Sequence, residues 1–562
     1  MKVSDWLPKS VECLRHYDRR TFLADLIAGV TVGLVALPLA MAFAISSGVP
    51  PQAGLYCAVV AGFLISALGG SRAQIGGPTG AFVVVVSGIV AHHGLDGLLT
   101  CTIMAGVILI VLGATGMGTA VDFIPRPVIV GFTNGIAVLI ASTQIRDLLG
   151  LDIPQPSGLF VPRLVEIARA LPTISWPAAG LGIASLAVIL AGNRLVRRVP
   201  GTIMALFAGT VAAWLLHLPV ETIGTRFGGV PAGLPPFSPP SFRPELFQVL
   251  MAPALTVAML GAIESLMSAV VADRMTGDRH NPNVELVAQG VANIAAPLFG
   301  GLPATGAIAR TATSIRSGAR TPVAGMIHAL TLLAILVFAA PWAKYVPLAI
   351  LSAILLIVAY HMGDWEEIPE LLKLSRADVS VWAVTFALTV LADLTVAVEA
   401  GMILAALLFI RKVAATTTVS EVTEEDIEEG RVHVLQGRSI PDYASVFRIH
   451  GPFLFGSTDK LDAVTEDIAG LPPIVILRLR NMTAIDATGL RAFEDLADRL
   501  HASGRALILC GAREQPARLM RRAAFDAHIG HANICANVQE ALDRARAIHD
   551  AGEPGEGAGT SR

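Results

Sequence analysis

The string PATGAIART, residues 303–311, stands between two long apolar blocks, yet it contains a proline, a glycine, two threonines and an arginine. It is too interrupted for a continuous helix, and its apolar neighbours argue against a surface loop. A second string, GGPTGAF at 76–82, has a similar pattern, because Gly-Pro-Thr-Gly-Ala at 77–81 matches Pro-Ala-Thr-Gly-Ala at 303–307. Two short segments interrupted by Gly and Pro, in matching positions of two halves, indicate the binding site of a transporter. We call 76–82 the first string and 303–311 the second string.

The composition around the two strings favours a membrane protein. The chain has 562 residues, of which 54% are hydrophobic and 15% charged, and its mean hydropathy is +0.64. Soluble proteins carry about 25% charged residues, so the bilayer is the expected solvent. The net charge of −3 gives no support for nucleic-acid binding. The five cysteines form no CxxC or metal-ligand spacing, so the sequence predicts neither a disulfide framework nor a metal site.

Apolar stretches long enough to cross a bilayer recur along residues 22–415. They form two series of seven, 22–218 and 248–415, separated by a stretch rich in Pro and Gly, and each string belongs to the third member of its series. An odd number of spans per series places the two halves in opposite orientations, which is an inverted repeat. The expected spans lie near 22–44, 53–69, 79–91, 97–116, 119–145, 174–192, 200–218, 248–272, 284–300, 305–316, 322–340, 342–361, 378–397 and 398–415.

Basic residues set the expected orientation. With the N-terminus inside, most of the Lys and Arg of the short connections fall on the cytoplasmic side, and the outside connections hold few. Residues 1–21 are mixed in charge and lack a signal-peptide core, so they are interpreted as a cytoplasmic lead. The expected location is the cytoplasmic (inner) membrane, with both termini in the cytoplasm.

The composition changes after residue 415. Residues 416–439 are polar and acidic and are interpreted as a linker. In 440–550, strand patterns such as IVILRL (474–479) alternate with helical patterns, which predicts a small α/β domain. The tail 551–562 is expected to be disordered.

Glu264 is an ionisable residue in the apolar stretch 254–272. An acid at such depth is costly and usually has a function. Ser268 follows one turn later on the same helical face. We interpret Glu264 and Ser268 as a site for a coupling ion, a proton or a cation; a structural hydrogen bond between helices is the alternative interpretation.

Arg310 lies five residues after Thr305 in the second string. A helix that begins inside the membrane presents unpaired N–H groups and a positive dipole end, and a guanidinium beside them makes an anion site. Extension of Arg310 to the cytoplasmic surface is the alternative. In the first string, Thr79, Gly80 and Ala81 would supply the opposing N–H groups, and a simple kink is the alternative there.

Long strings of this chain resemble the SulP family of anion permeases, which includes bacterial sulfate, bicarbonate and dicarboxylate carriers and animal sulfate/chloride exchangers. The similar strings are 25–56, GPTGAFVVVVSGIVA (77–91), ESLMSAVVAD (264–273) and 300–325. The C-terminal domain resembles STAS. The resemblance implies an all-α membrane domain with fourteen transmembrane segments in a seven-plus-seven inverted repeat of the uracil-permease type. In that fold a core domain holds the anion between the third and tenth spans and moves against a gate domain, and homodimers are usual.

The resemblance also implies residue roles. Glu264 stands at the coupling-acid position, with Ser268 beside it, and glutamate there is more typical of proton-coupled than of sodium-coupled members. STAS regulators carry a phosphorylatable serine directly after an aspartate. At the matching string this chain has Asp486 followed by Ala487, so packing, dimerisation or binding of a cytoplasmic partner is the expected role of the domain. The anion-contacting positions are Phe43, Thr79, Ala307, Ile308, Ala309 and Arg310.

The sequence therefore predicts a secondary transporter of small anions, by alternating access, with no cofactor beyond the coupling ion. No GxxxxGK[ST] or Ser-His-Asp pattern suggests ATP drive or catalysis, so an enzyme is not expected. Proton-coupled sulfate uptake is the leading hypothesis. A bicarbonate or C4-dicarboxylate symporter, coupled to protons or sodium, and an anion exchanger stay open, because backbone N–H groups accept many anions. An anion-gated sensor and a nucleobase permease are further alternatives.

Overall fold

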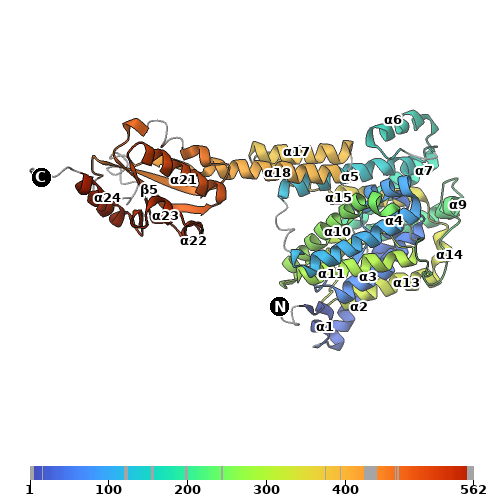
Figure 1. Ribbon diagram of the computed structural model, residues 1–562. Helices are drawn as coiled ribbons and strands as arrows, with labels where there is room; N and C mark the ends of the chain where they lie inside the picture. The colour runs from blue at the N-terminus through green and yellow to red at the C-terminus, as the bar shows by residue number, and fades with distance from the viewer. Residues whose placement is uncertain are drawn as a thin grey trace, which may run out of the picture. The chain divides into compact units, whose positions relative to one another are not determined.

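The computed structural model describes residues 6–15, 17–118, 125–153, 157–195, 200–241, 245–373, 375–392, 394–422, 440–461, 464 and 468–552. Most of the predicted linker and tail, 423–439 and 553–562, lie outside the described residues. The chain divides into two compact units, Met1–Ala405 and Ala406–Arg562, which we describe separately (Figure 1).

The first unit is almost entirely helical. It contains two strands of two residues each, β1 (Gly76–Gly77) and β2 (Thr305–Gly306), and the short 3-10 helices η3 (Leu171–Thr173) and η4 (Ala296–Phe299). Its last helix, α18, continues into the second unit. The helices are α1 (Lys9–Leu14), α2 (Arg19–Ser46), α3 (Pro51–Leu68), α4 (Phe82–Ala114), α5 (Arg126–Leu149), α6 (Phe160–Ala170), α7 (Trp176–Leu195), α8 (Gly201–Leu215), α9 (Ile223–Phe227), α10 (Leu246–Thr276), α11 (Pro282–Ala295), α12 (Ile308–Arg316), α13 (Val323–Phe338), α14 (Ala340–Ala343), α15 (Leu348–Met362), α16 (Glu367–Leu371), α17 (Arg376–Leu391) and α18 (Leu394–Thr416).

Many of these helices suit a bilayer. Seven helices in the described part of the chain are long and apolar enough to cross a membrane, and α8 and α13 are shorter apolar helices. Two expected spans share α4, where Gly94 interrupts the helix with φ 68°. The second string forms β2 and the start of α12, a helix of only nine residues. The fold is thus a mostly helical membrane fold, and the total of fourteen spans stays a prediction.

Helix packing repeats with the two halves exchanged. In one set of contacts, α4 packs against α10 and α11; in the matching set, α13 packs against α2 and α3 (Figure 1). The strands join the halves as an antiparallel pair, with Gly76 opposite Gly306 and Gly77 opposite Thr305. Such interleaving is what a twofold relation between the halves requires, and it supports the predicted inverted repeat.

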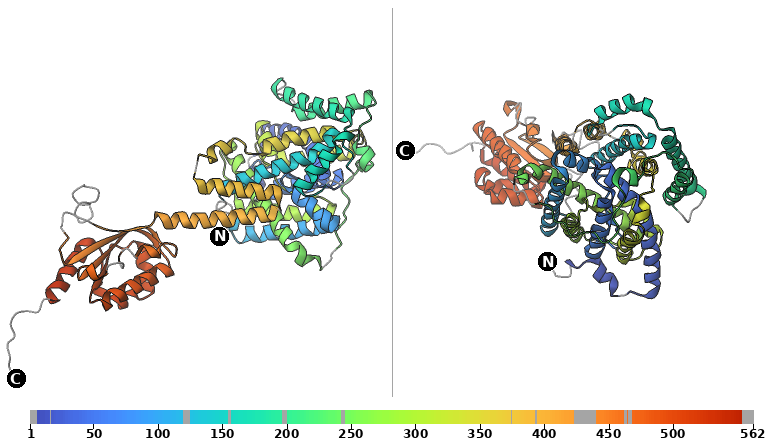
Figure 2. Two further views of the ribbon diagram at one scale, coloured as in Figure 1. Left: turned by 90° about the horizontal axis from the view of Figure 1, so that it is seen from above. Right: turned by 90° about the vertical axis from the view of Figure 1, so that its right-hand side faces the viewer.

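A second group of helices packs around α5. This helix contacts α15 and α17, and α15 also contacts α7 and α8 (Figure 2). The helices therefore sort into one group around the two strings and another group around α5. These groups correspond to the core and gate domains that the family resemblance implies.

Glycine brings α4 and α11 into backbone contact. A Cβ on Gly106 would lie 2.7 Å from the carbonyl oxygen of Gly290, and a Cβ on Gly290 would lie 2.6 Å from that of Gly106. Any larger residue would separate the helices, and small residues are the usual means of close helix packing in membranes. This contact fixes the helices that flank both strings.

The second unit contains a five-stranded sheet in the order β3-β4-β5-β6-β7. Figure 2 shows strands of this sheet with helices packed beside them. β3 is antiparallel to β4, and the other neighbours are parallel. One face packs against a cluster that includes Phe453, Phe493 and Phe525, and the other packs against α24. The elements are β3 (Thr418–Glu421), β4 (Ala444–Phe453), β5 (Ile474–Ile485), α21 (Ala487–Ala502), β6 (Ala506–Cys510), α22 (Glu514–Arg522), α23 (Phe525–Ile529), β7 (Ile534–Cys535) and α24 (Val538–Gly552). The predicted α/β domain is confirmed.

Candidate functional site

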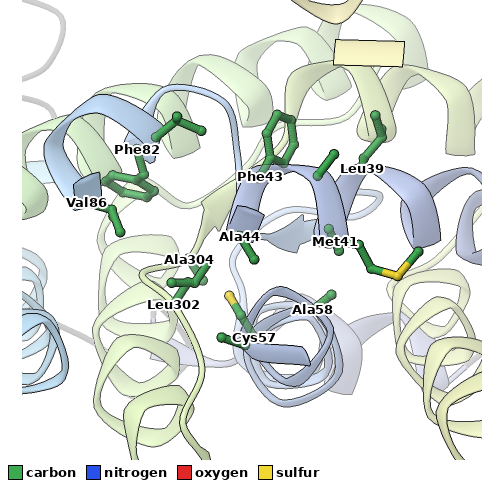
Figure 3. Close-up of a cluster of buried hydrophobic side chains, with 14 of the residues drawn as sticks. Leu39, Met41, Phe43, Ala44, Cys57, Ala58, Phe82, Val86, Leu302 and Ala304 are labelled. Carbon is green, nitrogen blue, oxygen red and sulfur yellow. The ribbon is translucent and has the colours of Figure 1, made fainter. Parts of the chain in front are cut away.

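The two strings lie side by side. Beyond the β1–β2 pair, the N–H of Ala307 donates a hydrogen bond of 2.8 Å to the carbonyl oxygen of Ile75. Figure 3 shows Phe43, Cys57, Phe82 and Ala304 gathered from four segments around this pair. The strings are distant in sequence, and the structure makes them direct partners.

Each strand is followed by a helix, with one residue between β2 and α12 and four residues between β1 and α4. α12 begins at Ile308 with Ala307 as its N-cap, so Ile308, Ala309 and Arg310 occupy its first turn. The N–H groups of a first turn have no acceptor within the helix. Ala307 is buried, Ile308 is half-buried and Ala309 is exposed. The second string therefore presents free N–H groups and a positive dipole end at an accessible place.

The first string leads into α4 through a short turn, and the N-cap of α4 is helical in conformation, whereas that of α12 is extended. α4 begins at Phe82 with Ala81 as its N-cap, and the N–H of Val83 donates to the carbonyl oxygen of Gly80 at 3.0 Å. Thr79 and Ala81 are both buried. Two helix N-termini thus start from one strand pair, which suits an anion that approaches both.

Glu264, on α10, contacts the first string directly. The hydroxyl of Thr79 donates a hydrogen bond of 2.8 Å to Oε2 of Glu264. Glu264 is half-buried, although it lies in the middle of an apolar helix. The structure therefore joins the predicted coupling acid to a predicted anion-contacting residue.

Ser268 has a different partner. It is fully buried, and its Oγ lies 3.0 Å from Oγ1 of Thr311 on α12. The same Thr311 oxygen accepts a hydrogen bond of 3.0 Å from the N–H of Ile75. Among the described residues, no hydrogen bond joins Ser268 to Glu264, so Ser268 connects α10 to the second string one turn away from the acid.

Arg310 turns back towards the first string. Its side chain is 3% exposed, and its Nη2 donates to the carbonyl oxygen of Pro78. Nη1 has no partner among the described residues, and a Cβ on Gly77 would lie 2.8 Å from it. The guanidinium therefore adds positive charge behind the strand pair and does not extend to the surface.

Phe43 and two residues that the sequence did not single out enclose Gly80. A Cβ on Gly80 would lie 3.0 Å from Cδ1 of Ile140, 3.2 Å from Sδ of Met362 and 3.3 Å from Cε1 of Phe43. Ile140 is on α5 and Met362 is on α15, so both come from the second helix group. Nothing in an apolar span distinguishes these two residues from their neighbours, so the sequence held no signal for them.

A buried polar network that the sequence analysis also missed supports the strings. Nε2 of Gln74 donates to Oγ of Ser265 at 2.9 Å, and that hydroxyl donates to Oε1 of Glu285 at 3.3 Å. The side-chain amide of Asn293 donates to the carbonyl oxygen of Ala304 at 2.8 Å. Glu285, Gln289 and Asn293 recur every four residues on α11, and this polar stripe was the available signal.

No metal centre is evident in the described part of the chain, where no group of three or more His, Cys, Asp or Glu could hold an ion. The site contains the acid Glu264, the guanidinium of Arg310, the hydroxyls of Thr79, Ser268 and Thr311, and two helix N-termini. Interrupted helices of this kind, starting inside a helical membrane unit, are typical of secondary transporters.

Comparison with known proteins agrees with this class. The model of the Sulfate permease family matches residues 22–385, and that of the STAS domain matches residues 438–541. The chain therefore belongs to the sulfate permease family and carries a C-terminal STAS domain. It is a polytopic membrane protein and an anion transporter of this family, not an enzyme.

Two relatives show the range of names within the family. The chain is 41% identical over 519 residues to "Putative sulfate transporter YvdB" of Bacillus subtilis, covering 92% of this chain and 96% of that protein. It is 30% identical over 540 residues to "Bicarbonate transporter BicA" of Picosynechococcus, covering 94% and 95%.

Solved structures share the fold. The overall structure of SLC26A9 matches with a TM-score of 0.84 at 17% identity, covering 98% of this chain and 94% of that chain. The transmembrane domain of a cyanobacterium bicarbonate transporter BicA matches with a TM-score of 0.61 at 30% identity, covering 69% and 98%.

Proposed function

We propose that this protein carries a small oxyanion, sulfate first, into the cytoplasm together with a proton, by alternating access across the cytoplasmic membrane. Both termini lie in the cytoplasm in this proposal. The observation that supports it most is the hydrogen bond from the Thr79 hydroxyl to Glu264. It connects the acid that would take the proton to the string that would take the anion.

This hydrogen bond supplies a coupling mechanism. A hydroxyl has one hydrogen, so while Thr79 donates to the ionised Glu264 it has none to offer to an anion. Once Glu264 is protonated, its own O–H donates to Thr79 and releases the threonine hydrogen for the anion. Protonation also removes a negative charge that would repel the anion. Proton and anion binding therefore favour each other, as symport requires.

The anion itself would lie between the starts of α4 and α12. The backbone N–H groups of Ala81, Ile308 and Ala309 would donate to it, and Phe43 would close one side. Arg310 would contribute its charge from behind the strand pair, because its Nη2 is already used by Pro78. Backbone donors select charge and size rather than one chemical identity.

Sulfate is favoured because the relative with 41% identity is named a putative sulfate transporter. Bicarbonate is the second candidate, because a relative with 30% identity is named a bicarbonate transporter. A C4-dicarboxylate, sodium as the coupling ion and uncoupled exchange are outcomes that the experiment below separates. A homodimer and a cytoplasmic partner of the STAS domain belong to the same proposal.

The test is uptake into proteoliposomes of labelled sulfate, bicarbonate and fumarate, with and without an inward proton gradient and with and without sodium. We expect sulfate to accumulate when protons flow inward and to be indifferent to sodium. Accumulation that needs sodium, or that occurs only with a counter-anion inside, would overturn proton symport. Absence of flux for every anion would favour an anion-gated sensor.

A further inference from the structure

A row of side chains crosses the sheet of the STAS unit from one edge to the other. Neighbouring strands place Ser420 opposite Arg448, Arg448 opposite Arg478, Arg478 opposite Cys510, and Cys510 opposite Cys535. Register partners point to the same face of a sheet. Cys510 and Cys535 belong to the cluster under α24, so the whole row is on the α24 face.

α24 covers only part of this face. It begins immediately after β7, and its buried residues pack in one cluster with Val446, Ile476 and Ile508. Near its end, the ring of His549 stacks on Tyr443, just before β4, at a centroid distance of 4.0 Å. The helix therefore crosses from the end of β7 to the start of β4. It leaves the later part of β4 and β5 uncovered, where Arg448 is half-buried and Arg480 is exposed.

Arg478 is a buried cation for which the described residues supply no counter-charge. Its exposed fraction is 8%, and it has no hydrogen bond or ion pair with any described residue. Arg448 stands directly opposite on the neighbouring strand, and its Nε donates to Oγ of Ser420 at 3.0 Å. Burial lowers the pKa of Arg478; the Cys510 thiol opposes this effect, and the charges of Arg480 and Arg448 lower the pKa further.

This arrangement is unfavourable without an anion. Like charges directly opposite each other on neighbouring strands destabilise a sheet, and a buried unpaired charge does so more strongly. Guanidinium groups form paired hydrogen bonds with tetrahedral oxyanions, and a hydroxyl adds one donor. We propose that Arg448, Arg478 and Arg480, with Ser420, form an oxyanion site for inorganic sulfate or phosphate on the cytoplasmic domain.

The site would bind the same chemical class as the proposed substrate, but it does not depend on what is transported. Both sulfate and phosphate offer a divalent tetrahedral group of similar size, and the arms of the experiment distinguish them. Chloride at equal ionic strength controls for screening of the three positive charges.

The test uses the full chain in lipid nanodiscs and measures amide hydrogen exchange in peptides of β4 and β5, with sulfate, phosphate or chloride. At an anion concentration of about ten times Kd, we expect exchange through local opening to slow about tenfold. R478Q should abolish this protection. R491Q removes an exposed arginine of α21 that pairs with Glu494, and it should keep the protection. Slower exchange that results from anion binding at the membrane site would persist in R478Q, so binding at the membrane site and binding at the STAS site can be distinguished.

A second measurement covers the case in which R478Q alters folding. R448Q removes the half-buried partner of the row and should also lose the protection. Thermal unfolding of the full chain should then show that sulfate or phosphate raises the Tm of the STAS transition in the wild type but not in R448Q. Protection by one of the two anions alone identifies the ligand. Equal protection by chloride, or protection that survives both R478Q and R448Q, overturns the proposal.

Discussion

In the first half of the membrane unit β1 leads into α4, a helix of 33 residues, whereas in the second half β2 leads into α12, which has nine. Both helices follow the strand pair, α12 after one residue and α4 after four, but the side chains of the two strings differ. The first string contributes Thr79, bonded to Glu264, and the second contributes Arg310, bonded to the carbonyl oxygen of Pro78. Two groups from the second half thus contact adjacent residues of the first string.

This difference shows how a repeat can divide the work of transport. Both backbones supply N–H groups at the start of a helix, so each half would hold one side of the anion. The acid and the guanidinium both come from the second half, so the coupling ion and the fixed charge would both act on the first string. Substitutions in each half should therefore have different effects, and the following predictions test that division.

The largest expected effect is that of E264Q. Glutamine keeps a group that can bond to Thr79 but cannot carry a proton, so accumulation driven by a proton gradient should vanish. With one proton per anion, a gradient of one pH unit supports about tenfold accumulation in the wild type. The mutant should only equilibrate the anion across proteoliposomes. Counterflow exchange that remains in E264Q is the control for folding; wild-type accumulation in E264Q would refute the role of the acid.

R310A should weaken anion binding by roughly 10- to 100-fold, because a charge-assisted interaction contributes about 1.5–3 kcal/mol. The change also leaves the carbonyl of Pro78 without its donor. R310K keeps the positive charge but not the planar N–H donors of the guanidinium, so it should bind sulfate with intermediate affinity. A binding titration with sulfate measures all three proteins, and equal affinity in R310A and the wild type would remove Arg310 from the site.

These two residues also show what a sequence can predict. An acid inside an apolar helix and an arginine beside a broken helix are unusual enough to be noticed. The shared pattern of the first and second strings predicted that these two strings are partners. The direction of Arg310 was not predictable, because a long side chain can extend to either side. Ile140 and Met362 were missed because nothing in the sequence of an apolar span indicates which residues an apolar side chain contacts. Ser268 was grouped with Glu264 from helical spacing and from the family resemblance, and neither could predict its contact with Thr311.

T79V tests the first string. Valine keeps the shape of threonine but removes the hydroxyl that bonds to Glu264, so we expect about tenfold weaker proton-coupled uptake at limiting sulfate, from about 1.5 kcal/mol for a lost hydrogen bond to a charged group. T79S keeps the hydroxyl and is the matched control. If T79V and T79S transport equally well, the hydroxyl takes no part in coupling.

G80A should have the smallest effect of the four. The added methyl would lie 3.0 Å from Cδ1 of Ile140 and 3.2 Å from Sδ of Met362, so it would hinder the close approach of the two helix groups. We expect transport about fivefold slower, since mild overpacking costs about 1 kcal/mol. G88A, on α4 eight residues further along, is the control, because its methyl would meet nothing within 4 Å. A G80A rate equal to that of G88A would show that this contact does not limit transport.

The most direct test of the coupling between Glu264 and the anion is the pH dependence of sulfate affinity in the purified protein. Because linkage is reciprocal, a proton that promotes anion binding must make sulfate bind more tightly as the pH falls, by up to about tenfold per pH unit for one proton. We predict this slope in the wild type and a flat profile in E264Q. A flat wild-type profile, or the same slope in E264Q, would contradict the account.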